Sequence, residues 1–257
     1  MIAIFFALSQ EIAPLKARVN ILKKIRHAHA TFYQSEFSGF PVALIQTGIG
    51  KNVSEIIPYV TKRFRIQLFV SSGFAGSLKP EVGIGDLIIG KQVLTTQQKI
   101  SEEKIQINAA LPCDTPTVNA AVKASSFHDF NSHCGDILSV NTIIQQASLK
   151  KHLGIQTPAI AVDMESFMIA EQSNAMGIPF VVVRAISDGV AEDLKIEEKL
   201  VTKSGNISIS ATALHVLQKP YHIPYLNRLR KQTKLAAHTL EVFLPDFITQ
   251  IHNSVLT

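Results

Sequence analysis

Short apolar runs separated by glycine, proline and polar residues recur along most of the chain. The run at residues 2–8 is rich in β-branched and aromatic side chains and predicts a strand. Pro14 limits the following helix to a start within about the preceding turn, because proline is tolerated only near a helix N-terminus. Glu11 is therefore expected where the first strand gives way to a helix.

Further apolar runs bounded by turn residues predict more strands. These strands are expected at residues 31–38, 42–47, 67–72 and 87–89. Glycine turns are expected at 48–50, where a helix to about residue 64 begins, and at 73–76. Residues 91–112 are polar and show no clear period.

The clearest pattern lies between residues 159 and 188. A short apolar strand at 159–162 is followed by a helix to about Met176, with Gly177 as its C-cap, and by a buried strand at 180–186. This βαβ pattern, with near-continuous apolar strands, indicates a mixed, mostly parallel sheet flanked by helices. The predicted fold class is α/β, with three layers in the order α/β/α and ligands bound beyond the carboxyl ends of the strands.

A chain of 257 residues that is 46% hydrophobic is long enough for one large domain. No linker, repeat or low-complexity segment interrupts it, so residues 1–257 are expected to form a single domain. Residues 1–8 lack the length of a signal peptide, and no run is long enough to span a membrane, so a cytoplasmic protein is expected.

The charge balance of 25 Lys and Arg against 20 Asp and Glu is too even to indicate a nucleic acid partner. Small molecules are the expected ligands. Cys113 and Cys134 lack the spacing of a redox pair or a zinc site, so reduced thiols and no metal are expected. Residues 48–53 lack the third glycine of a dinucleotide fingerprint and no phosphate-binding loop occurs, which argues against a nicotinamide or ATP enzyme.

Residues 219–244 predict a basic amphipathic helix that Pro245 would end. Its basic residues are His222, Arg228, Arg230, Lys231 and Lys234. One interpretation is a packed C-terminal helix with a solvated face. The other is a peripheral contact with anionic membrane lipid.

Three acidic residues stand where predicted strands end, namely Glu11, Glu165 and Asp188. Each alone has an ordinary explanation, because acids favour the first turn of a helix and aspartate favours turns. Since the carboxyl ends of parallel strands share one edge of a sheet, we expect the three to meet there.

Six short segments carry a resemblance to a known family, in the order in which that family has them. They are ALSQEI (7–12), TGIGK (47–51), SGFAGSL (72–78), VGIGDLI (82–88), AVDME (161–165) and FVVVRAISD (180–188). They resemble the nucleoside phosphorylase and nucleosidase superfamily, in particular the methylthioadenosine/S-adenosylhomocysteine nucleosidases. The likeness covers about residues 1–193, with a gap at 91–133.

The resemblance implies a cofactor-free enzyme, usually a homo-oligomer, that cleaves the N-glycosidic bond of a purine nucleoside. Glu11 would activate the attacking water, Asp188 would protonate the purine at N7, and Glu165 would hold the ribose hydroxyls. The other implied substrate contacts are Ile49, Phe74, Ala75, Gly76, Leu138, Val140 and Met164. Desolvation by the apolar strand at 180–183 would favour a protonated Asp188, and Arg184, if near, would oppose it.

Two departures refine the expected activity. Residues 7–11 lack the arginine-bearing start of the phosphorylases, which favours hydrolysis over a phosphate-dependent reaction. Phe74 replaces a small hydroxyl residue common in the nucleosidases. Together with AVDMES (161–166) and the tail, it resembles the hopanoid-associated subgroup, which releases adenine from adenosylhopane. The alternatives are a phosphorylase, with phosphate as second substrate, and a non-catalytic nucleoside-binding protein.

Overall fold

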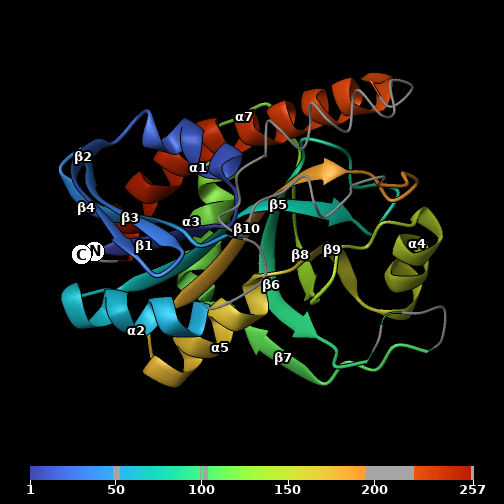
Figure 1. Ribbon diagram of the computed structural model, residues 1–257, viewed down its shortest axis with the longest axis horizontal. Helices are drawn as coiled ribbons and strands as arrows, with labels where there is room; N and C mark the ends of the chain where they lie inside the picture. Colours follow the sequence, from blue (N-terminus) through green and yellow to red (C-terminus); the bar gives the residue numbers. More distant parts are fainter. Residues whose placement is uncertain (49–52, 99, 101–103, 195–222, 256–257) are drawn as a thin grey trace.

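Figure 1 shows a β-sheet with helices on both sides in the computed structural model, which describes residues 1–48, 53–98, 100, 104–194 and 223–255. The strands are β1 (Ile2–Phe6), β2 (Asn20–His27), β3 (Ala30–Phe37), β4 (Phe40–Gln46), β5 (Leu68–Ser77), β6 (Leu87–Thr95), β7 (Ala109–Pro112), β8 (Ser132–Ser139), β9 (Ala159–Asp163) and β10 (Phe180–Asp188). The helices are α1 (Ser9–Lys16), α2 (Val53–Arg63), α3 (Thr115–Ser125), α4 (Ala147–Gln156), α5 (Ser166–Met176) and α7 (Ile223–Ser254).

The strands form one mixed sheet. Parallel pairings join β4, β1, β5 and β10 in one group and β6, β8 and β9 in another. Antiparallel pairings add β2 and β3 next to β4, join β6 to β7 and β10, and join β9 to the end of β5. In Figure 1, α1 and α7 lie on one side of the sheet and α2 and α5 on the other. The predicted α/β/α fold class is confirmed.

The glycine turn predicted at residues 73–76 is wrong, because these residues continue β5. Along this stretch β5 pairs with β10 and, at Gly76 and Ser77, with β9. The glycines instead allow close approach of side chains to the strand. A Cβ atom on Gly73 would lie 2.7 Å from Glu11 Oε1. Residues 91–112, which showed no period, contain the end of β6 and all of β7.

The strand, helix and strand predicted between residues 159 and 188 are confirmed as β9, α5 and β10. Gly177 caps α5 in the left-handed conformation, with φ of 64°. The expected parallel direction is wrong, however. Because β9 is antiparallel to β5 and β10 is parallel to β5, β9 and β10 run in opposite directions.

The predicted end of the C-terminal helix at Pro245 is also wrong, because α7 continues through it to Ser254. An interior proline costs about 3 kcal/mol. Beyond it, Phe247, Ile248 and Ile251 are completely buried, and each such side chain contributes about 1.5–3 kcal/mol. Residues 219–222 of the predicted helix lie outside the described residues. None of the helices in the described part of the chain is long and apolar enough to cross a membrane.

The two cysteines are free thiols, Cys113 buried and Cys134 exposed. Burial raises the pKa of Cys113 to about 12. Cys113 therefore stays protonated at neutral pH and packs as a small apolar side chain.

Gly154 lets α4 pack against the end of β5, and Gly154→Ala is expected to destabilise the protein. The added Cβ atom would lie 2.0 Å from the carbonyl oxygen of Leu78. We expect the free energy of unfolding to fall by about 1–3 kcal/mol, although alanine is normally the better helix former by about 1 kcal/mol. Urea denaturation measures the change.

The matched control is Ile155→Ala on the same helix, at a side chain that is 80% exposed. This control is expected to change stability by less than about 0.5 kcal/mol. A Gly154→Ala protein as stable as the wild type would show that α4 is not packed as tightly as described.

Candidate active site

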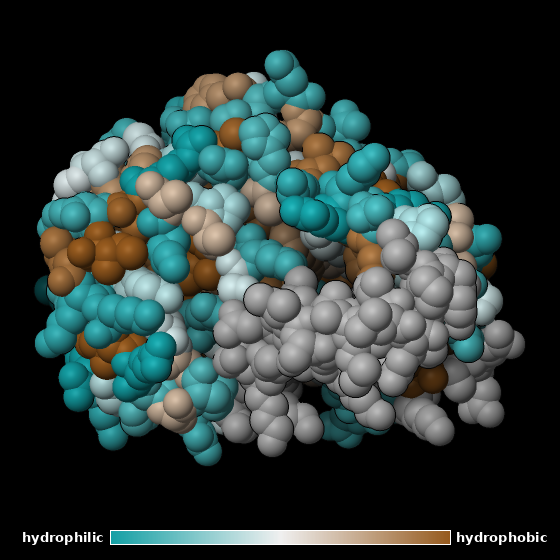
Figure 2. Space-filling view, turned by 45° about the horizontal axis from the view of Figure 1, so that its top comes forward, coloured by the Kyte–Doolittle hydropathy of each residue, from teal (hydrophilic) through white to brown (hydrophobic). Residues whose placement is uncertain are grey.

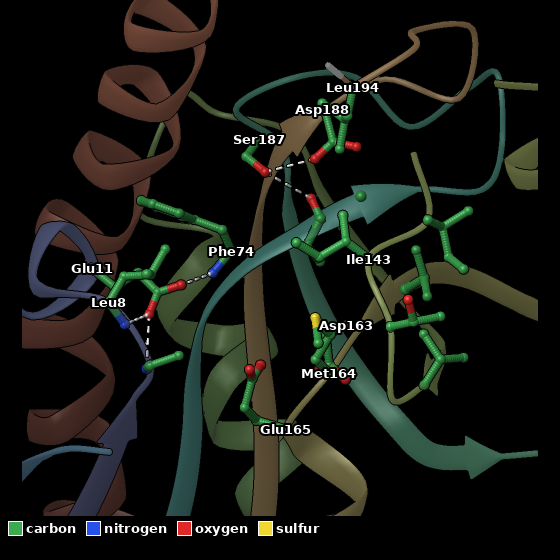
Figure 3. A pocket seen from close by; sticks show the side chains of 17 residues that line it. Leu8, Glu11, Phe74, Ile143, Asp163, Met164, Glu165, Ser187, Asp188 and Leu194 are labelled. Atoms are coloured by element: carbon green, nitrogen blue, oxygen red, sulfur yellow. Dashed lines mark hydrogen bonds between the residues drawn. The ribbon is translucent and has the colours of Figure 1, made fainter. Parts of the chain in front are cut away.

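A cavity of about 200 Å³ lies where β1, β5, β9 and β10 approach one another (Figure 3). All three acids expected to converge line it, and Figure 3 shows Glu11, Asp188 and Glu165 at separate corners. The described lining residues are Ala7, Leu8, Glu11, Phe74, Ala75, Gly76, Val140, Thr142, Ile143, Ile144, Val162, Asp163, Met164, Glu165, Ser187, Asp188 and Leu194. A mostly apolar lining with a few polar side chains that converge on one space is typical of a small-molecule site.

Glu11 lies in the first turn of α1, directly after β1, and its side chain is almost fully buried. Its Oε2 accepts hydrogen bonds from the backbone N–H groups of Ala7 (2.9 Å) and Leu8 (2.7 Å). Its Oε1 accepts one from the N–H of Phe74 (2.8 Å). The bond to Leu8 is half of a capping box. These donors fix both oxygens of the carboxyl group.

Burial raises the pKa of Glu11 above its usual range. The three backbone hydrogen bonds and the charge of Arg184 act in the opposite direction, because they stabilise the carboxylate. A carboxylate that is poorly solvated yet held in place is suited to take a proton from a water molecule.

Asp188 is the last residue of β10 and lies at another corner of the cavity. Ser187 Oγ donates a hydrogen bond of 2.8 Å to Asp188 Oδ1. Asp188 Oδ2 accepts from the ammonium group of Lys150, which belongs to α4 and has no exposed surface. A Cβ atom on Gly76 would lie 2.9 Å from this oxygen, so glycine is needed there. The carboxyl group is thus held from three sides.

The sequence indicated neither α4 nor Lys150. A signal for Lys150 exists, since it shares the buried face of α4 with Leu153 and Gly154 at helical spacing. A lysine on an apolar face is a candidate for a buried ion pair.

The ion-pair partner of Arg184 is Asp163 rather than Asp188. Arg184 Nε lies 2.8 Å and Nη2 2.7 Å from Asp163 Oδ2. Its Nη2 also donates to Ser71 Oγ (2.7 Å) and Ser166 Oγ (3.1 Å). Arg184 and Asp163 are both buried. The pair joins β10 to the end of β9 and so sets where the following residues lie.

Glu165 and Met164 follow β9 and line the cavity, as predicted. The predicted reason is wrong for this strand. Since β9 is antiparallel to β5 and β10, its carboxyl end does not share their edge of the sheet. The carboxyl end of β9 instead reaches the cavity from the direction opposite to that of β5 and β10, close to the middle of β5.

Phe74, Ala75, Gly76 and Val140 line the cavity, as the resemblance implied. Leu138 does not; it is completely buried in β8 and packs in a second apolar cluster that includes Leu78, Leu94 and Leu153. Val140, one residue beyond the end of β8, belongs to the same cluster and also reaches the cavity. Ile49 lies outside the described residues. The lining residues that the sequence did not indicate are Ala7, Leu8, Thr142, Ile143, Ile144, Val162, Asp163, Ser187 and Leu194.

The mixed sheet, its two helix layers and a cavity ringed by fixed carboxyl groups define an α/β enzyme. A family model described as Phosphorylase superfamily matches residues 1–217. The chain belongs to this superfamily.

Individual relatives agree with this assignment. The 5'-methylthioadenosine/S-adenosylhomocysteine nucleosidase of Staphylococcus saprophyticus is 30% identical over 196 residues, covering 73% of this chain and 86% of the relative. The nucleosidase of the same description from Staphylococcus haemolyticus is 28% identical over 211 residues, covering 78% and 92%. A solved nucleosidase from Neisseria meningitidis, in complex with methylthio-immucillin-A, has a TM-score of 0.73 at 20% identity, covering 96% of this chain and 97% of that chain. It has the same fold.

Proposed function

We propose that the protein hydrolyses the N-glycosidic bond of an adenine nucleoside modified at its 5′ position and releases adenine. The observation that carries the proposal is the placement of Glu11, Glu165 and Asp188 around one cavity. The similarity to nucleosidases acting on methylthioadenosine and adenosylhomocysteine supports it.

The chemistry needs a carboxyl group at each end of the breaking bond. As the base leaves C1′, positive charge builds on the ribose and negative charge on the base. In the proposed mechanism Glu11 takes the proton of the attacking water, and Asp188 delivers a proton to N7 of the purine. Glu165 accepts hydrogen bonds from the ribose hydroxyls, which strengthen in the transition state, and Met164 packs against the sugar.

Hydrolysis is favoured over phosphorolysis by the charges around the cavity. The described lining residues include no lysine or arginine. Arg184, on the buried side of Glu11, is engaged by Asp163, Ser71 and Ser166. A phosphate ion beside the Glu11 carboxylate would therefore lack a cation to balance it.

The proposed 5′ substituent is apolar, because Leu8 and Phe74 line the cavity beside Glu11. A methylthio group and the polycyclic chain of adenosylhopane both fit this chemistry. The test is to incubate the protein with methylthioadenosine, adenosylhomocysteine, adenosylhopane and adenosine, with and without phosphate, and to measure free adenine.

Adenine released equally with and without phosphate is the expected result. Release that depends on phosphate would identify a phosphorylase. No release from any of the four nucleosides would leave a nucleoside-binding protein and refute the proposal.

The contact of α7 with anionic lipid stays a prediction, as do the homo-oligomer and the cytoplasmic location. Arg228, Arg230, Lys231 and Lys234 are exposed on α7, and Figure 2 shows a face on which hydrophilic residues and smaller hydrophobic patches alternate. Such a surface would bind lipid mainly through charge. Sedimentation with anionic and with neutral liposomes tests the contact, and its absence with both refutes it.

The pH dependence of the reaction is expected to report the raised pKa of Glu11. The base must be ionised, so kcat/KM falls as the pH falls through this pKa. The fall should begin above about pH 4.3, where an exposed glutamate titrates. The effect on stability has the opposite sign, because a carboxyl group with a raised pKa in the folded state loses its stabilising contribution as the pH rises.

The measurement is kcat/KM against pH for two substrates, methylthioadenosine and 4-nitrophenyl β-D-ribofuranoside. Both need Glu11, but the nitrophenolate leaves without a proton. The fall of kcat/KM at low pH should therefore appear with both substrates. If kcat/KM instead fell near the pH at which an exposed glutamate titrates, this result would count against Glu11 as the buried base.

A further inference from the structure

A buried ammonium group contacts the proposed acid directly. Lys150 has no exposed surface, and its Nζ forms an ion pair with Asp188 Oδ2. The two remaining donors of Nζ bond to the carbonyl oxygens of Gly189 (3.2 Å) and Glu192 (3.1 Å). Burial of a charge costs several kcal/mol unless it is paired and fully hydrogen-bonded. Lys150 meets both conditions only through Asp188 and the residues that follow it.

The turn after Asp188 is also fixed from a second helix. Glu192 Oε2 accepts a hydrogen bond from the N–H of Gly189 (3.2 Å). Gln232 of α7 donates to Glu192 Oε1 (2.9 Å) and Oε2 (3.0 Å). Lys150 from α4 and Gln232 from α7 thus hold the same turn. The proposed acid is placed by two helices rather than by its own strand alone.

The ion pair bears on the source of the proton that Asp188 would give to the purine. In the ionised form of this pair the proton lies on Lys150 Nζ. Asp188 is then a carboxylate, which cannot protonate a leaving base. The group in contact with Asp188 Oδ2 that holds a transferable proton is Lys150 itself. None of the described residues that line the cavity carries an ammonium or guanidinium group.

We infer that Lys150 is a positioning residue that holds Asp188 against the base and supplies the proton that Asp188 passes to it. This inference rests on the proposed nucleoside hydrolysis. The proton moves from Nζ to Oδ2, and the resulting carboxylic acid gives a proton to N7 of the purine. The C1′–N9 bond breaks with its electron pair moving into the base. Lys150 is left as a neutral amine and regains a proton from solvent after adenine leaves, which balances the proton that Glu11 takes from water.

A purely structural ion pair would behave differently. It would stabilise the fold but would not distinguish one leaving group from another. Adenine must be protonated before it can leave the ribose, whereas 4-nitrophenolate leaves without a proton. The dependence on the leaving group therefore separates the two roles of Lys150.

The experiment compares wild type, Lys150→Met and Lys151→Met on methylthioadenosine and on 4-nitrophenyl β-D-ribofuranoside. Lys151 is the exposed neighbour on the same helix and serves as the matched control. For Lys150→Met we expect kcat on methylthioadenosine to fall by about 10²-fold or more, with KM changed less than about threefold. On the nitrophenyl riboside the same variant should keep its rate within about threefold. Lys151→Met should match wild type on both.

A double variant covers the case in which Lys150→Met folds poorly because Asp188 is left as an unpaired buried charge. Lys150→Met combined with Asp188→Asn removes both charges. If Lys150 acts through Asp188, the double variant should have the kcat of Asp188→Asn alone, within about threefold. A further loss in the double variant, or an equal loss on both substrates, would overturn the inference, as would a wild-type or raised kcat of Lys150→Met on methylthioadenosine. A wild type that releases no adenine would instead refute the proposed function, and this inference with it.

Discussion

Asp188→Asn is expected to lower kcat on methylthioadenosine by about 10²- to 10⁴-fold, the usual contribution of a positioned acid. Asparagine has the shape of aspartate, and its amide oxygen can still accept from Lys150 Nζ. Because Lys150 then loses its charged partner, the free energy of unfolding should fall. The variant should still bind the nucleoside, but it cannot pass a proton to N7. Steady-state kinetics give kcat and KM, and calorimetric titration with the nucleoside gives the affinity, which should change little.

Two comparisons make this result specific. On 4-nitrophenyl β-D-ribofuranoside, Asp188→Asn should retain most of its rate, because no proton is needed. Asp193→Asn alters an exposed carboxylate a few residues away that does not line the cavity. Asp193 Oδ1 accepts a hydrogen bond of 2.8 Å from the N–H of Ala147, which the amide oxygen of asparagine can also accept, so this variant should act like wild type. Wild-type turnover of methylthioadenosine by Asp188→Asn would refute the role of this residue as the acid.

Glu11→Gln is expected to lower kcat by about 10²- to 10⁴-fold on both substrates, because both reactions need an activated water molecule. This pattern differs from that of Asp188→Asn, so the two variants distinguish base from acid. Steady-state rates on the two substrates are the measurement. Rates near wild type on either substrate would show that Glu11 is not the base.

The same variant should also be less stable. Three backbone N–H groups donate to the two oxygens of Glu11, whereas glutamine offers one oxygen and one NH₂ group. At least one buried donor then loses its acceptor, which costs about 1–3 kcal/mol. Urea denaturation of Glu11→Gln measures this loss, and a stability equal to wild type would show that the three bonds are weaker than their geometry indicates.

Local sequence patterns were sufficient to predict those elements whose structure is determined by neighbouring residues alone. The apolar strands around α5 and the left-handed cap at Gly177 follow from residue types within a few positions of each other. The position of Glu11 at the start of α1 follows from the end of β1 and from Pro14. These elements place two of the three acids at the cavity, so the sequence indicated the acidic residues of the candidate site but fewer than half of the residues that line it.

Distant contacts explain what the sequence could not indicate. Pro245 looks like a helix end, but the buried residues of α7 beyond it outweigh the lost backbone hydrogen bond. The direction of β9 depends on its pairing with the end of β5, far away in the chain. Lys150 lies 38 residues before Asp188, and nothing in the residues around it shows that its ammonium group meets the proposed acid. Arg184 likewise finds its partner in Asp163 and not in the neighbouring Asp188.

The most direct measurement is a crystal structure of the Asp188→Asn variant with intact methylthioadenosine bound, since this variant should bind the nucleoside without cleaving it. We expect N7 of the adenine within hydrogen-bond distance of the side chain at position 188, the ribose hydroxyls on Glu165, and Glu11 facing C1′ across a water molecule. A nucleoside bound outside this cavity, or with its ribose away from Glu11 and Glu165, would contradict the convergence of the three acids on one substrate.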